Sequence, residues 1–134
     1  ELTELQLEEG TVTAFERRSY GQELALCQRY FYKSYSQATA IGAVTTEGAL
    51  YGTVQAANNY FSLSSGFPVS MRNTPTVINY STINGAVNQM SFDGANRAAL
   101  PISAGISGVS IRVNNVASAA NQFATVHLTA TAEL

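Results

Sequence analysis

The sequence predicts an all-β fold, an antiparallel and jelly-roll-like β-sandwich preceded by one short helix. Apolar and polar residues alternate with a period of two in several short segments, as they do in half-buried strands. Turn-forming pairs such as Asn84-Gly85 and Asp93-Gly94 separate these segments. No helical period follows Tyr35, so the chain lacks the crossover helices that a parallel sheet needs. This spacing indicates an antiparallel sandwich or barrel, and we expect the sandwich.

A short helix is predicted from about Tyr20 to Tyr30. Ser19 stands at the N-cap and Gln22 at the third helical position, which together match a capping box. Three apolar residues follow at helical spacing and are expected to pack in the core as a structural stripe: Leu24, Cys27 and Phe31. Cys27 is the single cysteine, so it has no partner for an internal disulfide and is expected to be a small buried residue.

Strands are predicted in six segments: Leu50–Ala56, Phe67–Arg72, Pro75–Tyr80, Gln89–Asp93, Val109–Asn114 and Ala124–Leu134. The last is the clearest, with alanine, valine and leucine on one face and threonine and His127 on the other, as in a half-buried strand. Turns are predicted at Asn58-Asn59, Ser64-Ser65-Gly66, Asn84-Gly85, Asp93-Gly94 and Asn114-Asn115.

Composition limits the classes of partner. The 134 residues fit one domain, and the net charge of −2 gives no electrostatic attraction for nucleic acid or an anionic membrane. No apolar run approaches the roughly 20 residues of a membrane span, so we expect no membrane insertion.

Charge is scarce and unevenly distributed. Charged residues make up 12% of the chain, against about 25% in an average globular domain. Only six follow Ser34: Glu47, Arg72, Asp93, Arg97, Arg112 and Glu133. The surface of the body is therefore either rich in hydroxyl and amide groups or covered by another chain.

The sequence offers little for catalysis, and we expect no enzyme, no cofactor and no metal site. A Ser-His-Asp triad would have to use His127, the only histidine, and no Gly-x-Ser-x-Gly turn is present. Glycan hydrolysis needs two paired carboxylates, and the body has only Glu47, Asp93 and Glu133. A metal ion held by three copies of His127 on a trimer axis is a minor alternative to a partly exposed or interface histidine on the threonine-rich face of a strand.

Three stretches together resemble the C-terminal domain of bacteriophage tail fibre and tail proteins. Residues 6–10 read QLEEG and residues 15–31 read FERRSYGQELALCQRYF, residues 67–76 read FPVSMRNTPT, and residues 128–134 read LTATAEL. The match spans the whole chain. It departs from the family at Thr13-Ala14-Phe15, which lacks the usual proline, at Thr131, where the family prefers aspartate, and at Leu128, which replaces an aromatic residue.

The resemblance implies a homotrimer that ends a tail fibre on the outside of a virion. Fibre tips of this family bind a surface polysaccharide, lipopolysaccharide or an outer-membrane protein of the bacterial host. Residues 1–18 are then a connecting segment from the upstream fibre, and residues 19–134 are the β-sandwich head. Two alternatives remain: a structural domain that trimerises and caps the fibre without its own receptor site, and an accessory domain of a polysaccharide-degrading tailspike.

Two predicted loops carry the side chains that sugar recognition requires. Aromatic faces and planar amide or guanidinium groups on loops of a rigid scaffold bind sugars well. The candidate ligand-binding residues are Asn58, Asn59 and Tyr60 in one loop, and Asp93, Asn96 and Arg97 in the loop predicted over Asp93–Arg97. The competing interpretation is that these residues only shape turns, pack inward or carry a solvated charge. We expect both loops at the same end of the sandwich.

Overall fold

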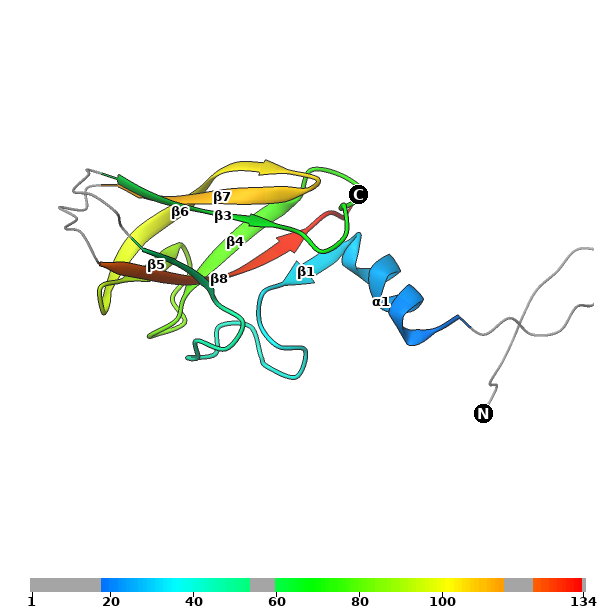
Figure 1. Cartoon of the computed structure of the whole chain (residues 1–134), viewed down its shortest axis with the longest axis horizontal. Coiled ribbons are helices and arrows are strands. Elements are labelled where there is room, and N and C mark those ends of the chain that lie inside the picture. Colours follow the sequence, from blue (N-terminus) through cyan, green and yellow to red (C-terminus); the bar gives the residue numbers. More distant parts are fainter. Residues whose placement is uncertain (1–17, 54–59, 115–121, 134) are drawn as a thin grey trace, which may run out of the picture.

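In the computed structural model, which describes residues 18–53, 60–114 and 122–133, eight strands follow one helix (Figure 1). The elements are α1 (Tyr20–Gln28), β1 (Phe31–Lys33), β2 (Leu50–Thr53), β3 (Tyr60–Gly66), β4 (Thr76–Ser81), β5 (Gln89–Phe92), β6 (Ala95–Gly105), β7 (Gly108–Asn114) and β8 (Phe123–Thr131). Neighbouring strands among these elements pair in antiparallel fashion. The predicted all-β class with one short N-terminal helix is confirmed.

Strand β8 is the centre of the sheet. Its residues 129–131 pair with β1 and residues 123–126 pair with β2. Residues 126–131 also pair with β4, and residues 124–125 pair with β5. A strand has two edges, so β1 and β2 share one edge of β8 while β4 and β5 share the other. The last stretch of sequence therefore holds four strands from distant parts of the chain.

The sheet curls into two facing layers because β6 takes part in both. Its first residues, 95–98, pair with β5, and residues 99–105 pair with β7, which in turn pairs with β3. The register shifts between Pro101 and Ser103, an irregularity of the kind that bends a strand. The two layers are thus continuous through β6, as the ribbon shows (Figure 1).

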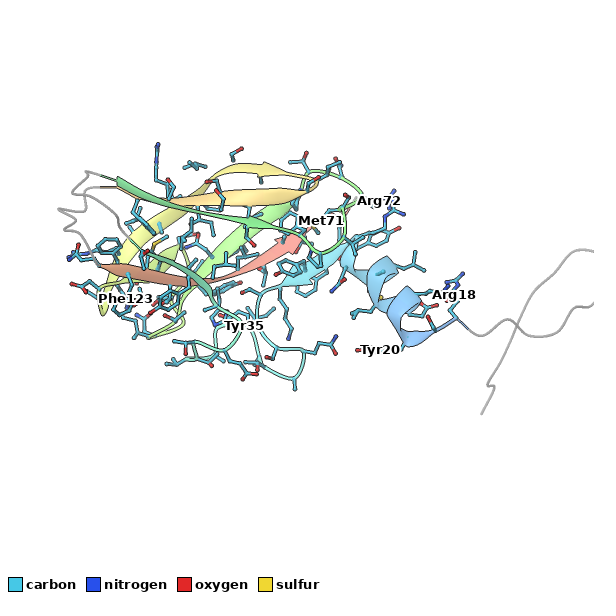
Figure 2. All side chains as sticks on the ribbon, viewed as in Figure 1. Arg18, Tyr20, Tyr35, Met71, Arg72 and Phe123 are labelled. Atoms are coloured by element: carbon cyan, nitrogen blue, oxygen red, sulfur yellow. The ribbon has the colours of Figure 1, made fainter. Side chains whose placement is uncertain are left out.

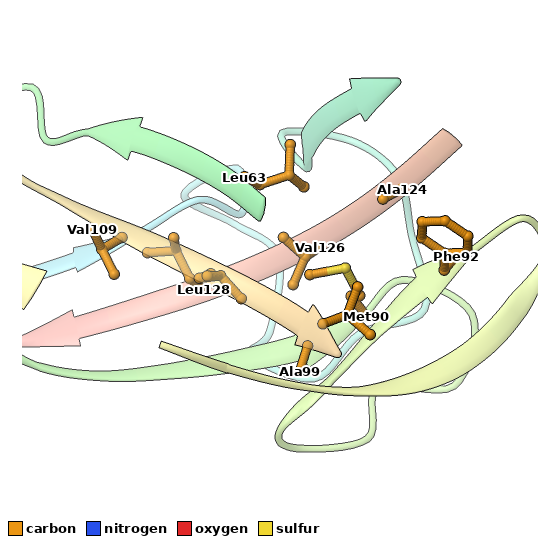
Figure 3. Close-up of a cluster of buried hydrophobic side chains, with 10 residues drawn as sticks. Leu63, Met90, Phe92, Ala99, Val109, Ala124, Val126 and Leu128 are labelled. Atoms are coloured by element: carbon orange, nitrogen blue, oxygen red, sulfur yellow. The ribbon is translucent and has the colours of Figure 1, made fainter. Parts of the chain in front are cut away.

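The hydrophobic core fills the space between these layers (Figure 3). Its fully buried members come from β5, β7 and β8, and include Met90, Ile111, Val126 and Leu128, each 0% exposed. Leu63 of β3 and Ala99 of β6 complete the cluster. Burial of this apolar area, at roughly 25 cal/mol per Å², is what offsets the conformational entropy lost on folding.

The prediction that β8 is half-buried is wrong, because its polar face is covered as well. Residues 124–130 are all buried, including Thr125, His127 and Thr129. The hydroxyl of Thr82, in the turn after β4, lies 2.7 Å from that of Thr125. Part of the connection from Ser34 to Ala49 bonds the ring of His127. The polar groups of Thr125 and His127 can be buried in this way because both have hydrogen-bond partners.

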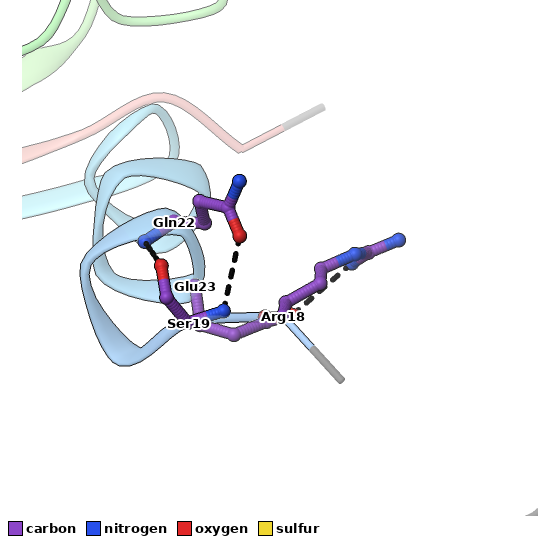
Figure 4. Close-up of polar contacts among 4 residues, drawn as sticks. All are labelled: Arg18, Ser19, Gln22 and Glu23. Atoms are coloured by element: carbon purple, nitrogen blue, oxygen red, sulfur yellow. Dashed lines mark hydrogen bonds and ion pairs between the residues drawn. The ribbon is translucent and has the colours of Figure 1, made fainter. Parts of the chain in front are cut away.

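Helix α1 begins where the capping box predicts it (Figure 4). The Gln22 amide donates to Ser19 Oγ at 3.3 Å, and the Ser19 amide donates to Gln22 Oε1 at 3.0 Å. Glu23 in the first turn pairs with Arg18 at 3.2 Å, a contact between exposed groups. Within the described part of the chain, no helix has the length and apolar character needed to cross a membrane.

The burial predicted for this helix is wrong. No residue of α1 is buried, Cys27 is exposed, and Phe31 just beyond the helix is 41% exposed. The helix extends away from the strands, and its C-terminal end is the part that joins the body (Figure 1). There the Ala132 amide donates to the Tyr30 carbonyl, and the guanidinium carbon of Arg72 lies 5.1 Å from the centre of the Tyr30 ring. Figure 2 labels Arg72 near this end of the helix.

Three further predictions about strands and turns fail. Residues 67–72 form no strand, since the amides of Phe67 and Met71 bond the carbonyls of the β6–β7 turn instead. The turn predicted at Ser64-Ser65-Gly66 is the end of β3, paired with residues 108–110. The loop predicted over Asp93–Arg97 is only a two-residue turn, because β6 begins at Ala95.

Candidate functional site

The turn between β5 and β6 is a tight hairpin at one end of the domain. Asp93 and Gly94 both have positive φ, at 50° and 75°, while Phe92 pairs with Ala95. Positive φ at both central residues is typical of the hairpin turns that Asp-Gly forms. The predicted hairpin at Asp93-Gly94 is confirmed, and it places the Asp93 carboxylate on an exposed tip.

The other predicted ligand-binding residues of this hairpin belong to β6. Asn96 lies opposite Ser91, and its Oδ1 accepts a hydrogen bond from the buried hydroxyl of Ser81. This amide oxygen is therefore bonded inside the domain. Arg97 lies opposite Met90 and has an exposed side chain. Of these two residues, Arg97 is the one whose side chain faces solvent.

The first predicted loop falls mostly outside the described residues. Asn58 and Asn59 lie there, and Tyr60 is described only as the first backbone position of β3, opposite Asn114. The ends of this connection are still located. Thr53, the last residue of β2, pairs with Phe123, and the Phe123 carbonyl accepts the amide of Asp93 at 2.8 Å. The start of the 54–59 connection and the Asp93-Gly94 turn therefore lie at the same end.

An exposed aromatic pair that the sequence analysis missed lies at this end. The rings of Tyr51 and Phe123 are nearly parallel, 5° apart, with centres separated by 5.8 Å. Tyr51 is 62% exposed and Phe123 is 38% exposed. They are neighbours because Tyr51 pairs with Thr125 and Phe123 pairs with Thr53, so both side chains stand on the outer face of the sheet.

Polar groups border this aromatic pair. Gln122 Nε2 donates to Asp93 Oδ2 at 3.0 Å; Asp93 is exposed and Gln122 is partly buried. We call Tyr51, Phe123, Gln122 and Asp93 the tip platform; Figure 2 labels Phe123 at its place in the domain. A signal for it exists in the sequence, since Tyr51 falls on the polar face of its predicted strand. An aromatic residue on a face expected to meet water indicates a contact surface.

The tip platform has the chemistry of a shallow sugar-binding surface. The exposed surface of the two stacked rings can contact the apolar C–H side of a pyranose, and both residues lie on paired strands. The Asp93 carboxylate accepts hydrogen bonds and the Gln122 amide donates and accepts them, as sugar hydroxyls require. The position on strand ends and a tight turn makes the arrangement rigid before a ligand arrives.

His127 is placed where it serves the fold. The ring is 0% exposed, Nδ1 lies 2.9 Å from Ser34 Oγ, and Nε2 lies 3.0 Å from the Thr45 carbonyl oxygen. Both nitrogens are engaged, so neither is available to a metal ion on a trimer axis. The pair with Ser34 is not a Ser-His-Asp triad, because the second nitrogen bonds a backbone carbonyl and not a carboxylate. Residues 18–53, 60–114 and 122–133 contain no cluster of three metal-ligating side chains.

No protein-family model, curated protein or solved structure matches this chain.

Proposed function

We propose that this chain is the tip domain of a bacteriophage tail fibre and attaches the virion to a bacterial host by binding a surface polysaccharide. The resemblance of residues 6–31, 67–76 and 128–134 to tail fibre domains supports this proposal. So does the all-β scaffold, which presents the tip platform at the end far from α1 (Figure 2). Lipopolysaccharide and an outer-membrane protein are the other receptors that the resemblance implies.

The observation that carries the proposal is the exposed pair Tyr51 and Phe123 beside the carboxylate of Asp93. Large aromatic rings seldom face solvent side by side unless they contact something, because that surface costs about 25 cal/mol per Å² in water. A receptor that presents both hydroxyls and an apolar face suits this combination of groups. The role of these residues is to bind the receptor and not to catalyse a reaction on it.

We expect Tyr51→Ala to weaken binding to a matching polysaccharide about tenfold or more, equivalent to about 1.4 kcal/mol, through loss of one stacking face. The probe is a panel of purified capsular and O-antigen polysaccharides, followed by calorimetry on any that binds the parent chain. The control is Ile106→Ala, since Ile106 is 47% exposed and follows the end of β6 that is far from the tip platform. This control should bind like the parent.

Binding by Tyr51→Ala and Phe123→Ala at parental strength, with unchanged melting, would show that the tip platform is not the site. Arg97→Ala tests the residue predicted from sequence in the same way. Retention of binding to whole cells after enzymatic removal of their polysaccharide would point to an outer-membrane protein as the receptor. Failure of the chain to bind either cells or polysaccharide would favour the structural alternative.

The structural alternative, a domain that trimerises and caps the fibre, is favoured by one observation of its own. Helix α1 buries none of its residues, and Tyr20, Leu26 and Tyr30 are 71%, 41% and 45% exposed. Isolated helices shorter than about 12 residues are marginal in water. A groove of about 260 Å³, lined by Leu24, Cys27 and Phe31 among others, runs beside this helix. Packing against a second copy of the chain would cover both helix and groove.

We expect the chain to form a homotrimer, with a mass by light scattering of about three times the 14.3 kDa of one chain. Neutral, apolar surfaces pack around a symmetry axis without like-charge repulsion. Leu26→Glu should shift the protein toward monomers, because the charge would fall in the contact surface. The control Val44→Glu, at a residue 64% exposed in the Ser34–Ala49 connection, should leave the mass unchanged. A stable monomer at micromolar concentration contradicts the trimer, which is compatible with either function.

A further inference from the structure

The connection from β1 to β2, residues Ser34 to Ala49, is fastened to the sheet over His127. Tyr35 in this connection is 3% exposed, and its ring stacks on the imidazole with centres 3.8 Å apart and planes 13° apart. The Tyr35 hydroxyl accepts the Gly42 amide at 3.1 Å, and Ser36 Oγ donates to Glu47 Oε1 at 2.7 Å. These bonds give the connection a defined shape. Ser34, Tyr35 and Thr45 all contact His127 of β8, and the Ser34 amide also donates to the Leu128 carbonyl at 3.0 Å.

The hydrogen bonds of His127 fix its protonation state. The Thr45 carbonyl only accepts, so Nε2 carries the proton and donates to it at 3.0 Å. In a neutral ring Nδ1 then accepts, and Ser34 Oγ donates to it at 2.9 Å. Ser34 Oγ in turn accepts the Leu128 amide at 3.0 Å. Each N–H or O–H in this series of hydrogen bonds has one acceptor, and this pattern requires a neutral imidazole ring.

Protonation of His127 at Nδ1 disrupts this pattern of hydrogen bonds. Protonated Nδ1 points an N–H at Ser34 Oγ, which already accepts from Leu128, and the serine proton must turn away from the ring. The positive charge is then enclosed in a site 0% exposed, and neither ring nitrogen has a carboxylate partner. Burying a charge without an ion pair is costly, so the state in which the ring reaches water is favoured. The ring reaches water when the covering connection lifts.

We propose that His127 is a proton-operated clasp, which holds the segment Ser34–Ala49 on β8 while neutral and releases it once protonated. The release is local, because the ring contacts given by the described residues are the Ser34 and Thr45 bonds and the Tyr35 stack. The hydrophobic core between the layers lies on the other face of β8 and is not part of the clasp.

The groups around the ring do not replace it as the titrating element. The titratable side chains of β1, β2, β4 and the Ser34–Ala49 connection are Tyr32, Lys33, Tyr35, Glu47, Tyr51 and Tyr80. Tyr32 packs against the hydrophobic core on the other face of β8. Burial raises the pKa of Tyr35, so that phenol stays neutral in acid. The Lys33 ammonium donates to the carbonyls of Gln37 and Thr39. Glu47 is exposed and accepts from Ser36.

The direction of the pH effect follows from burial. Desolvation lowers the pKa of His127 below its ordinary 6.5, while the bond to Thr45 opposes this in part. The opened state regains the ordinary pKa, so it binds more protons than the closed state between the two values. The clasp is therefore fully effective above about pH 6.5 and weakens as the pH falls through the lowered pKa of the closed state.

The wild-type chain provides the direct test, because His127 is its only histidine. A preparation without a histidine tag is followed by NMR from pH 7.5 to 5, reading the imidazole signals and amide exchange corrected for intrinsic rates. We expect the protection of Gly42 and Ala43 to fall by up to tenfold per pH unit below 6.5. The amides of Ile111 and Val113 in the core should stay more protected throughout.

Two variants separate the clasp from general stability. His127→Gln keeps a donor for Thr45 and an acceptor for Ser34 without a titrating group, so protection of the segment should become independent of pH. Tyr35→Phe removes the bond to Gly42 but keeps the stacked ring. It should lower protection about equally at every pH and leave the pH dependence in place.

Three results would overturn the proposal. The first is protonation of the His127 ring with no loss of protection in the Ser34–Ala49 segment. The second is a parallel loss in the segment and in Ile111 and Val113, which would make the histidine a determinant of global stability. The third is pH-independent protection in the wild-type chain. The wild-type measurements decide these outcomes even if His127→Gln does not fold.

Discussion

Leu128→Ala is expected to lower the free energy of unfolding by about 2 to 5 kcal/mol. Leu128 is 0% exposed and lies in β8 between Asn79 of β4 and Ser34, the residue that follows β1. Its side chain packs against the core residues of the facing layer. Truncation removes the transfer free energy of the lost methyl groups and leaves a cavity that paired strands on both edges cannot close. Denaturant unfolding followed by circular dichroism measures the loss.

The matched control is Leu100→Ala, the same substitution in β6 at a residue 57% exposed. Its expected effect is below about 1 kcal/mol, because most of that side chain already meets water. Equal losses at the two positions would contradict the central place of β8 in the core, or show that Leu100 is covered in an assembly. Unfolding at several protein concentrations tells these two explanations apart.

The elements that were predicted well are those specified by neighbouring residues. The capping box of Ser19 and Gln22 determines where α1 begins, because both bonds join residues three apart. Asp93-Gly94 determines the β5–β6 hairpin, because few other residue types accept positive φ at both positions. The alternation of residues 124–134 likewise predicts β8, since period two is a property of the strand itself.

Burial could not be predicted, because it depends on segments far away in the sequence. The spacing of Leu24, Cys27 and Phe31 is the same for a helix packed on its own core and for one left exposed. The polar residues of β8 predict a face exposed to solvent, but the Ser34–Ala49 connection covers that face. Ser34 and Thr45 of that connection form hydrogen bonds with His127, and local periodicity cannot predict bonds between segments so far apart in the sequence.

Strands β3 and β6 were missed for a related reason. β3 contains Ser62, Ser64, Ser65 and Gly66, a composition typical of turns, and β6 contains Pro101. Both are strands because they pair with β7, one on each of its edges. The tip platform was not predicted for the same reason, because Tyr51 and Phe123 become neighbours through the pairing of β2 with β8.

Two glycines that pair with each other at the end of the β6–β7 hairpin are expected to respond to alanine with opposite signs. Gly105 and Gly108 face each other across the hairpin, and neither has a φ in the left-handed region. Gly108 also pairs with Gly66, so a strand lies on each of its edges. A Cβ at Gly108 would overlap the carbonyl oxygen of Ser65, whereas a Cβ at Gly105 would meet nothing within 4 Å.

Gly108→Ala should therefore destabilise the domain by about 1 to 3 kcal/mol, because the obstructing atom is backbone in a paired strand and cannot rotate away. Gly105→Ala should stabilise it by about 0.4 to 1 kcal/mol, because alanine reduces the conformational entropy of the unfolded chain without strain in the folded one. Denaturant midpoints of the two variants at equal slope measure both effects. Destabilisation by both to the same extent would mean that the end of β3 does not cross Gly108 as closely as the strand pairing requires.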